Sequence, residues 1–164
     1  MKKATKIGLL MLMGIATTLF NGCKKEDKAP EVVTPAPTKT ELLTGKNWRM
    51  TALTVNPGID VSGTIITDWY SQLQSCEQDD LVKFNTNGSY TDDEGVTKCN
   101  SSDPQTSTGT WVFNTNQTII TQDGTDSYTI TELTSTTLKM SIVINEDNGS
   151  GPLNYTYAAT FTAQ

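Results

Sequence analysis

The sequence predicts an all-β fold, and specifically an eight-stranded antiparallel up-and-down barrel with one short helix. Short apolar runs recur across residues 41–164 and are separated by turns rich in glycine, asparagine, aspartate and threonine, a spacing typical of all-β domains. Within most runs apolar and polar residues alternate, as in strands that bury one face and expose the other. A two-sheet sandwich has the same pattern, but the tight turns between successive strands favour a meander that closes into a barrel.

The first 22 residues have the layout of an export signal. Three lysines lie within the first six residues, residues 7–20 are mostly apolar, and the small residue Gly22 precedes Cys23; this order is typical of a signal peptide. The end of the segment, residues 20–23, resembles a bacterial lipobox. The resemblance implies cleavage before Cys23 and lipid modification of its thiol. An ordinary signal peptide that ends near a cysteine is the alternative.

Residues 23–40 are expected to form the lipidated start of the mature chain and a disordered linker. Their charged residues and prolines are unsuited to burial in a core. The full chain has 12 basic and 18 acidic residues, and the loss of three lysines with the signal leaves a net charge of about −9. This charge argues against nucleic acid as a partner and against binding to anionic lipid through surface charge.

The expected membrane contact is therefore the lipid on Cys23, and the expected location is the bacterial cell envelope. Lys25-Glu26-Asp27 resembles the short signal that sends some Gram-negative lipoproteins to the outer leaflet. The resemblance points to the outer membrane and leaves the leaflet open.

The folded domain is expected at residues 41–164, beginning with a strand at 47–55 that ends before Pro57-Gly58. A helix is predicted at residues 65–74, because their apolar residues fall on one stripe at helical spacing. We expect this helix to pack over one end of the barrel.

A β-hairpin is predicted within residues 76–99, with its turn at Asn87-Gly88, because both turn residues tolerate positive φ. Cys76 and Cys99 lie near the outer ends of the hairpin. An even pair of cysteines in an exported domain predicts a disulfide. The remaining strands are predicted at residues 110–113, 118–122, 127–133, 136–145 and 153–163.

Several motifs together resemble the lipocalin-like domain of small bacterial lipoproteins over nearly all of residues 41–164. They are Leu43-Thr44-Gly45-Lys46-Asn47-Trp48, Asp79-Asp80 after a cysteine, Phe84-x-x-Asn87-Gly88-x-Tyr90, Gly109-x-Trp111 and Tyr128-x-Ile130-x-x-Leu133. The order of the motifs carries the resemblance. Two features depart from true lipocalins: Gly45 and Trp48 lie one residue further apart than in the usual Gly-x-Trp, and the late arginine that packs on the tryptophan is missing.

The resemblance implies a small hydrophobic ligand in the mouth of the barrel. The residues expected to contact it are Trp48, Tyr90, Trp111, Tyr128 and Tyr157. The alternative is a non-catalytic structural or protein-interaction module, because the many large inward residues could fill the interior of an eight-stranded barrel. A packed interior would favour this module, and a cavity of roughly 300 Å³ or more would favour the ligand.

The composition gives little support for an enzyme. The chain has no histidine, which removes the commonest general base and the commonest zinc ligand. Its acidic clusters fit no EF-hand loop, and nothing in the sequence places two carboxylates across a cleft. We therefore expect no catalytic residues, no metal and no cofactor, while a protein partner is unknown.

Overall fold

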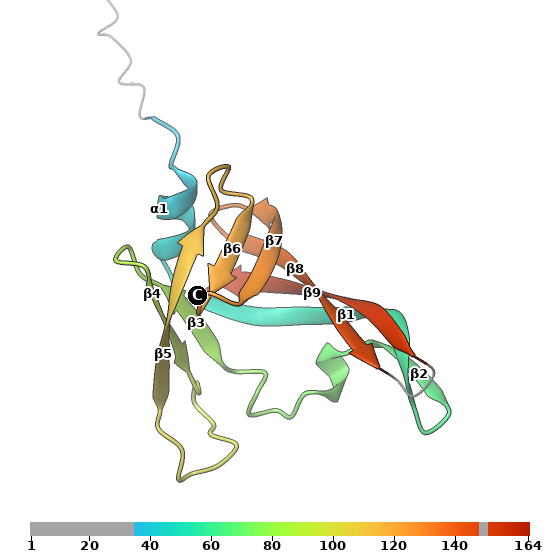
Figure 1. Cartoon of the computed structure of the whole chain (residues 1–164). Coiled ribbons are helices and arrows are strands. Elements are labelled where there is room, and N and C mark those ends of the chain that lie inside the picture. The colour runs from blue at the N-terminus through green and yellow to red at the C-terminus, as the bar shows by residue number, and fades with distance from the viewer. Residues whose placement is uncertain (1–34, 148–150) are drawn as a thin grey trace, which may run out of the picture. The chain divides into compact units, whose positions relative to one another are not determined.

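The computed structural model describes residues 35–147 and 151–164, and within them nine strands form one antiparallel sheet (Figure 1). The predicted signal peptide, Cys23 and most of the predicted linker lie outside the described residues. The strands are β1 (Trp48–Val61), β2 (Thr64–Asp68), β3 (Leu81–Phe84), β4 (Ser89–Asp93), β5 (Thr106–Phe113), β6 (Ile119–Gln122), β7 (Asp126–Leu133), β8 (Thr137–Asp147) and β9 (Pro152–Ala163).

Eight of these strands close into a barrel, which confirms the predicted fold class. β3 to β9 follow one another as antiparallel neighbours, and β1 pairs with β3 on one side and β9 on the other. The β1–β9 ladder runs from Trp48 opposite Ala163 to Asn56 opposite Thr156. Closure of this kind removes the free edges of a sheet. The ninth strand, β2, pairs with the far part of β1 outside the ring.

The predicted helix at residues 65–74 is wrong, because most of its first half forms β2. β1 continues through Pro57-Gly58, where its register with β2 shifts, and it turns back at Ser62-Gly63, whose φ angles are 55° and 86°. Two positive φ angles in a two-residue turn suit a tight hairpin. The β-branched run Thr64–Thr67 favours a strand at this position. Only a short 3₁₀ turn, η1 (Tyr70–Gln72), remains of the expected helix.

The α-helix of the domain, α1 (Lys39–Thr44), begins inside the stretch predicted to be linker. Thr38 caps it: the Thr38 hydroxyl accepts the Glu41 N–H at 3.2 Å, and the Glu41 carboxylate accepts the Thr38 N–H at 2.7 Å. This reciprocal pair is a capping box. The helix is short, so its stability depends on packing, which Leu43 supplies by being fully buried.

One end of the barrel is filled by a packed core. Leu43 of α1 meets the barrel interior there, and the core consists of Leu43, Trp48, Phe84, Trp111, Ile120, Leu138, Met140 and Phe161. The aromatic rings interlock edge to face: the Phe84 and Trp111 centroids are 5.6 Å apart, and those of Trp111 and Phe113 are 5.1 Å apart. Such arrangements stabilise aromatic clusters beyond the area they bury.

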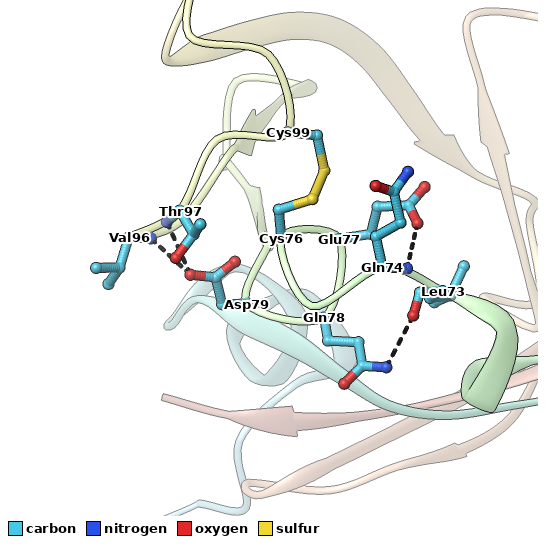
Figure 2. The surroundings of a disulfide bond; sticks show 9 residues. All are labelled: Leu73, Gln74, Cys76, Glu77, Gln78, Asp79, Val96, Thr97 and Cys99. Atoms are coloured by element: carbon cyan, nitrogen blue, oxygen red, sulfur yellow. Dashed lines mark hydrogen bonds between the residues drawn. A yellow bond between two sulfur atoms is a disulfide. The ribbon is translucent and has the colours of Figure 1, made fainter.

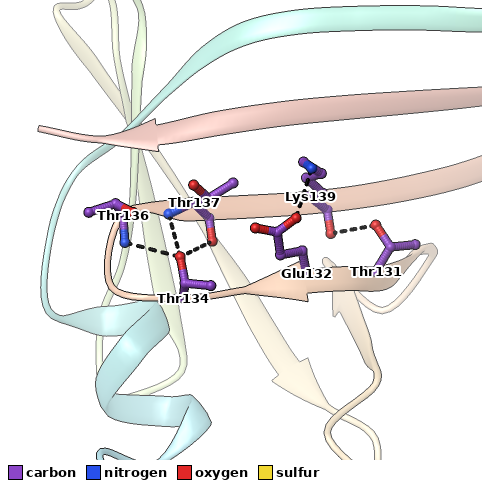
Figure 3. Close-up of polar contacts among 6 residues, drawn as sticks. All are labelled: Thr131, Glu132, Thr134, Thr136, Thr137 and Lys139. Carbon is purple, nitrogen blue, oxygen red and sulfur yellow. Dashed lines mark hydrogen bonds and ion pairs between the residues drawn. The ribbon is translucent and has the colours of Figure 1, made fainter.

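The turn between β7 and β8 is held by short polar contacts (Figure 3). The Thr134 hydroxyl oxygen lies 3.3 Å from the Thr136 N–H nitrogen and 3.0 Å from that of Thr137, and accepts from both. Lys139 and Glu132 form an ion pair at 2.7 Å across the two strands. An exposed pair of this kind contributes little free energy.

Candidate functional site

The barrel interior beyond the packed core contains a hollow of about 260 Å³, which we call the main hollow. Its lining comes from β1 and from β3, β4 and β6 to β9, so the residues are brought together only when the ring closes. They are Met50, Leu53, Val82, Asp92, Gln122, Tyr128, Met140, Ile142, Tyr157, Ala159 and Phe161. Most of this surface is apolar, as in sites for small hydrophobic ligands.

A second space, which we call the side hollow, has a volume of about 280 Å³ and adjoins the main one. The two share Met50, Val82, Asp92 and Phe161. The side hollow lies where β1 and β3 pair over only two residue positions. The segment between β2 and β3 covers this weakly paired seam and contributes Leu73, Glu77 and Asp80 to the lining.

The barrel is therefore packed at the α1 end and hollow at the other. The first half has the filled interior of the one expectation, and the second half has hollows slightly smaller than the cavity of the other. Neither hollow alone reaches 300 Å³, but the two adjoin, so the interior offers room for one small molecule.

The structure separates the five residues expected to contact a ligand into two groups. Tyr128 and Tyr157 line the main hollow, and Trp48 lines the side hollow. Trp111 and Tyr90 line neither. Trp111 is buried in the core, where its indole N–H donates to the Asn85 carbonyl at 3.1 Å.

Tyr90 connects neighbouring strands of the barrel. Its ring packs over Gly109, where an added Cβ would lie 2.5 Å from the ring. Its hydroxyl donates to Asp123 at 2.6 Å, and Asp123 also accepts the Thr110 N–H at 2.8 Å. This bond to the carboxylate raises the pKa of Tyr90 and lowers the pKa of Asp123. The tyrosine thus ties β4 to the β6–β7 turn across β5.

Two carboxyl groups give the hollows a negative character. Asp92 follows Tyr90 by two residues, so it shares the inward face of β4, and it remains open to solvent through the hollow. Partial loss of hydration raises the pKa of its carboxyl group. Burial, together with the charges of Glu94, Asp79, Glu77 and Asp92, raises the pKa of Asp80 to about 6. No lysine or arginine lines either hollow within the described residues.

A disulfide between Cys76 and Cys99 fastens the segment that covers the side hollow (Figure 2), as predicted. The Cα atoms are 5.2 Å apart. Asp79 strengthens the same junction, because its Oδ2 accepts the N–H groups of Val96 and Thr97 at 3.0 and 2.9 Å. The β4–β5 loop and the segment before β3 are thus joined by one covalent bond and two hydrogen bonds.

A comparison with protein families finds that the model of the lipocalin-like domain matches residues 43–140. The chain belongs to the lipocalin-like domain family. No curated protein matches the chain significantly. The match ends within β8, whereas the structure shows that β9 is the strand that closes the barrel against β1.

This lipocalin-like domain holds its buried tryptophan without the late arginine of true lipocalins. The Trp48 indole N–H donates to the Leu43 carbonyl at 2.8 Å. The Lys46 ammonium lies 5.6 Å from the centre of the Trp48 ring and donates to the Ser135 carbonyl. A cation over the face of an indole is a favourable contact, so Lys46 covers this tryptophan in the present chain.

The main hollow also contains residues that the sequence analysis did not select for a site, among them Asp92, Gln122 and Ala159. For Asp92 and Ala159 the signal that could have identified them is alternation, because they lie two residues from Tyr90 and Tyr157, which were expected to face inward. The polar side chains of Asp92 and Gln122 and the small side chain of Ala159 did not mark these residues as interior.

The described residues contain no group of three or more histidines, cysteines or acids arranged to hold a metal ion. They also contain no helix of the length and hydropathy needed to cross a membrane.

Proposed function

We propose that this protein is a cell-envelope lipoprotein, anchored by a lipid on Cys23, whose lipocalin-like barrel binds a small hydrophobic molecule without catalysing a reaction. The observation that carries the binding proposal is the main hollow, which is mostly apolar, lies inside a barrel of the lipocalin-like family and borders the packed core, with which it shares Met140 and Phe161. Barrel mouths are common ligand sites because they surround a small molecule with preformed apolar surface.

A matched pair of variants tests binding in the main hollow. Ala159 lines the hollow, whereas its neighbour Ala158 is exposed on the outer face of β9. Ala159→Trp should fill the space and weaken binding of a neutral fluorescent probe such as N-phenyl-1-naphthylamine on the order of tenfold or more. Ala158→Trp should leave the affinity unchanged.

The outcome of this experiment distinguishes the two functions considered. Equal binding by wild type and both variants would place the probe elsewhere on the protein and contradict the proposal. Absence of binding in the wild type would favour a structural or interaction module instead. Native mass spectrometry of the protein purified from cell envelopes would show a retained ligand directly.

The anchor is tested separately from the barrel. The sequence around Cys23 resembles a lipobox, and several acyl chains hold a protein on a membrane far more stably than one. Cys23→Ala should move the protein from the membrane fraction to the supernatant without altering probe binding. A variant that still sediments with membranes would show that another part of the chain provides the attachment.

A further inference from the structure

We infer that the ligand is an amphiphile with an apolar body and a cationic head, which the carboxylates of Asp92 and Asp80 receive. This inference rests on the proposed binding function and specifies the chemistry of its ligand. It excludes fatty acids and other carboxylate amphiphiles as preferred ligands.

The first support is the distribution of charge around the two hollows. Asp92 belongs to both linings, while Asp80 and Glu77 belong to the side hollow. The remaining lining residues are uncharged, so a molecule that enters the barrel meets negative charge only. An anionic head would be repelled at close range inside a wall of low polarity, and a cationic head would be attracted.

The second support is an unused acceptor. Oδ1 of Asp80 is buried and has no hydrogen-bond partner among the described residues. A buried carboxylate oxygen without a donor is costly, and the side hollow brings a ligand within reach of this residue. An ammonium head in the side hollow would place positive charge and N–H donors beside this carboxylate.

The third support is the placement of the acids relative to the apolar surface. Asp92 is shared by the two hollows, whereas Met140, Ile142 and Ala159 line only the main one. A ligand with its head at Asp92 can therefore place its apolar body in the main hollow. This arrangement matches the usual design of such pockets, in which a few polar groups orient an otherwise apolar ligand.

Three eight-carbon probes that differ only in head group test the inference: octylammonium, 1-octanol and octanoate. Each is titrated at neutral pH and low salt against the protein loaded with N-phenyl-1-naphthylamine. Octylammonium should bind about tenfold tighter than octanol, and octanoate should bind more weakly than octanol. Asp92→Asn should reduce the preference for the amine to about threefold, and Asp80→Asn with Asp92→Asn should reduce it further, leaving Glu77 as the remaining carboxylate in the two linings.

Asp103→Asn is the matched control, because it removes one negative charge from the exposed β4–β5 loop outside both hollows. It should keep the full preference for the amine. Equal binding of octylammonium and octanol by the wild type, or an undiminished preference in the double variant, would overturn the inference while leaving the proposed function intact. Failure of octanol and the neutral probe to bind at all would refute the binding function itself, and this inference with it.

Discussion

The disulfide should contribute about 3 kcal/mol to the free energy of unfolding. Cys76 and Cys99 are 23 residues apart in the sequence, and in the chain-entropy model a cross-link over a loop of this length restricts the unfolded chain by roughly that amount. The variant to compare is Cys76→Ala with Cys99→Ser. Alanine is chosen at position 76 because that side chain is buried, and serine at position 99 because that one is exposed.

The assay is urea unfolding followed by tryptophan fluorescence, since Trp48 and Trp111 lie in the core. With a denaturant slope on the order of 1.5 kcal/mol per molar, the midpoint should fall by about 2 M. Wild-type protein unfolded under reducing conditions is the control and should behave like the variant.

A loss below about 0.5 kcal/mol in both samples would refute the chain-entropy reasoning. A reduced wild type as stable as the oxidised protein, beside a destabilised variant, would show that side-chain packing at Cys76 matters rather than the cross-link. Probe binding should survive at low denaturant, because neither cysteine lines the main hollow.

Three further predictions concern the ends and junctions of the barrel. Leu43→Ala should cost about 3 kcal/mol in urea unfolding, because it empties a fully buried site under α1. Gly95→Ala should destabilise by roughly 1–3 kcal/mol, since φ is +66° there and a Cβ would lie 2.4 Å from the Asp79 carbonyl oxygen; an unchanged midpoint would contradict this. The pKa of Asp80 in the folded protein, about 6, lies above its ordinary value of 3.8. The folded state therefore binds the proton of this carboxyl group more tightly than the unfolded state does, and the free energy of unfolding should fall as pH rises from about 4 to about 6. Asp80→Asn should flatten this pH dependence and raise the free energy of unfolding at pH 7 by about 1 kcal/mol after allowance for solvent screening. If the variant keeps the pH profile of the wild type, Asp80 is not the source of the pH dependence.

Much of the barrel could be predicted because alternation and turn chemistry are local properties. The Asn87-Gly88 and Asp123-Gly124 turns, with positive φ at Gly88, Asp123 and Gly124, separate the strands that the pattern predicted. The helix predicted at residues 65–74 was wrong because the apolar spacing of this segment fits a helical stripe as well as a β-branched strand. Pairing with the far part of β1 decides between them, and no local pattern contains that information.

The site itself was less predictable than the fold. Large aromatic residues indicated which positions face the interior, but the sequence does not say at which height along the barrel axis each of them lies. Trp111 and Tyr128 are both inward residues, yet one packs in the core and the other lines the main hollow. The height follows from the ladder registers, which are set only when the strands pair.

By itself, the sequence determined the class of fold, the cysteine pairing and the absence of histidine chemistry, because each depends on residue type or on spacing along the chain. The tertiary structure alone decided that one half of the barrel is packed by α1 and the aromatic core while the other half is hollow. It also decided that Asp92 and Asp80, 12 residues apart in the sequence, border the same space. Closure of the ring by β9 against β1 produces the first result, since it brings distant strands around one interior. The second follows from the β3–β4 ladder, in which Val82 lies opposite Asp92.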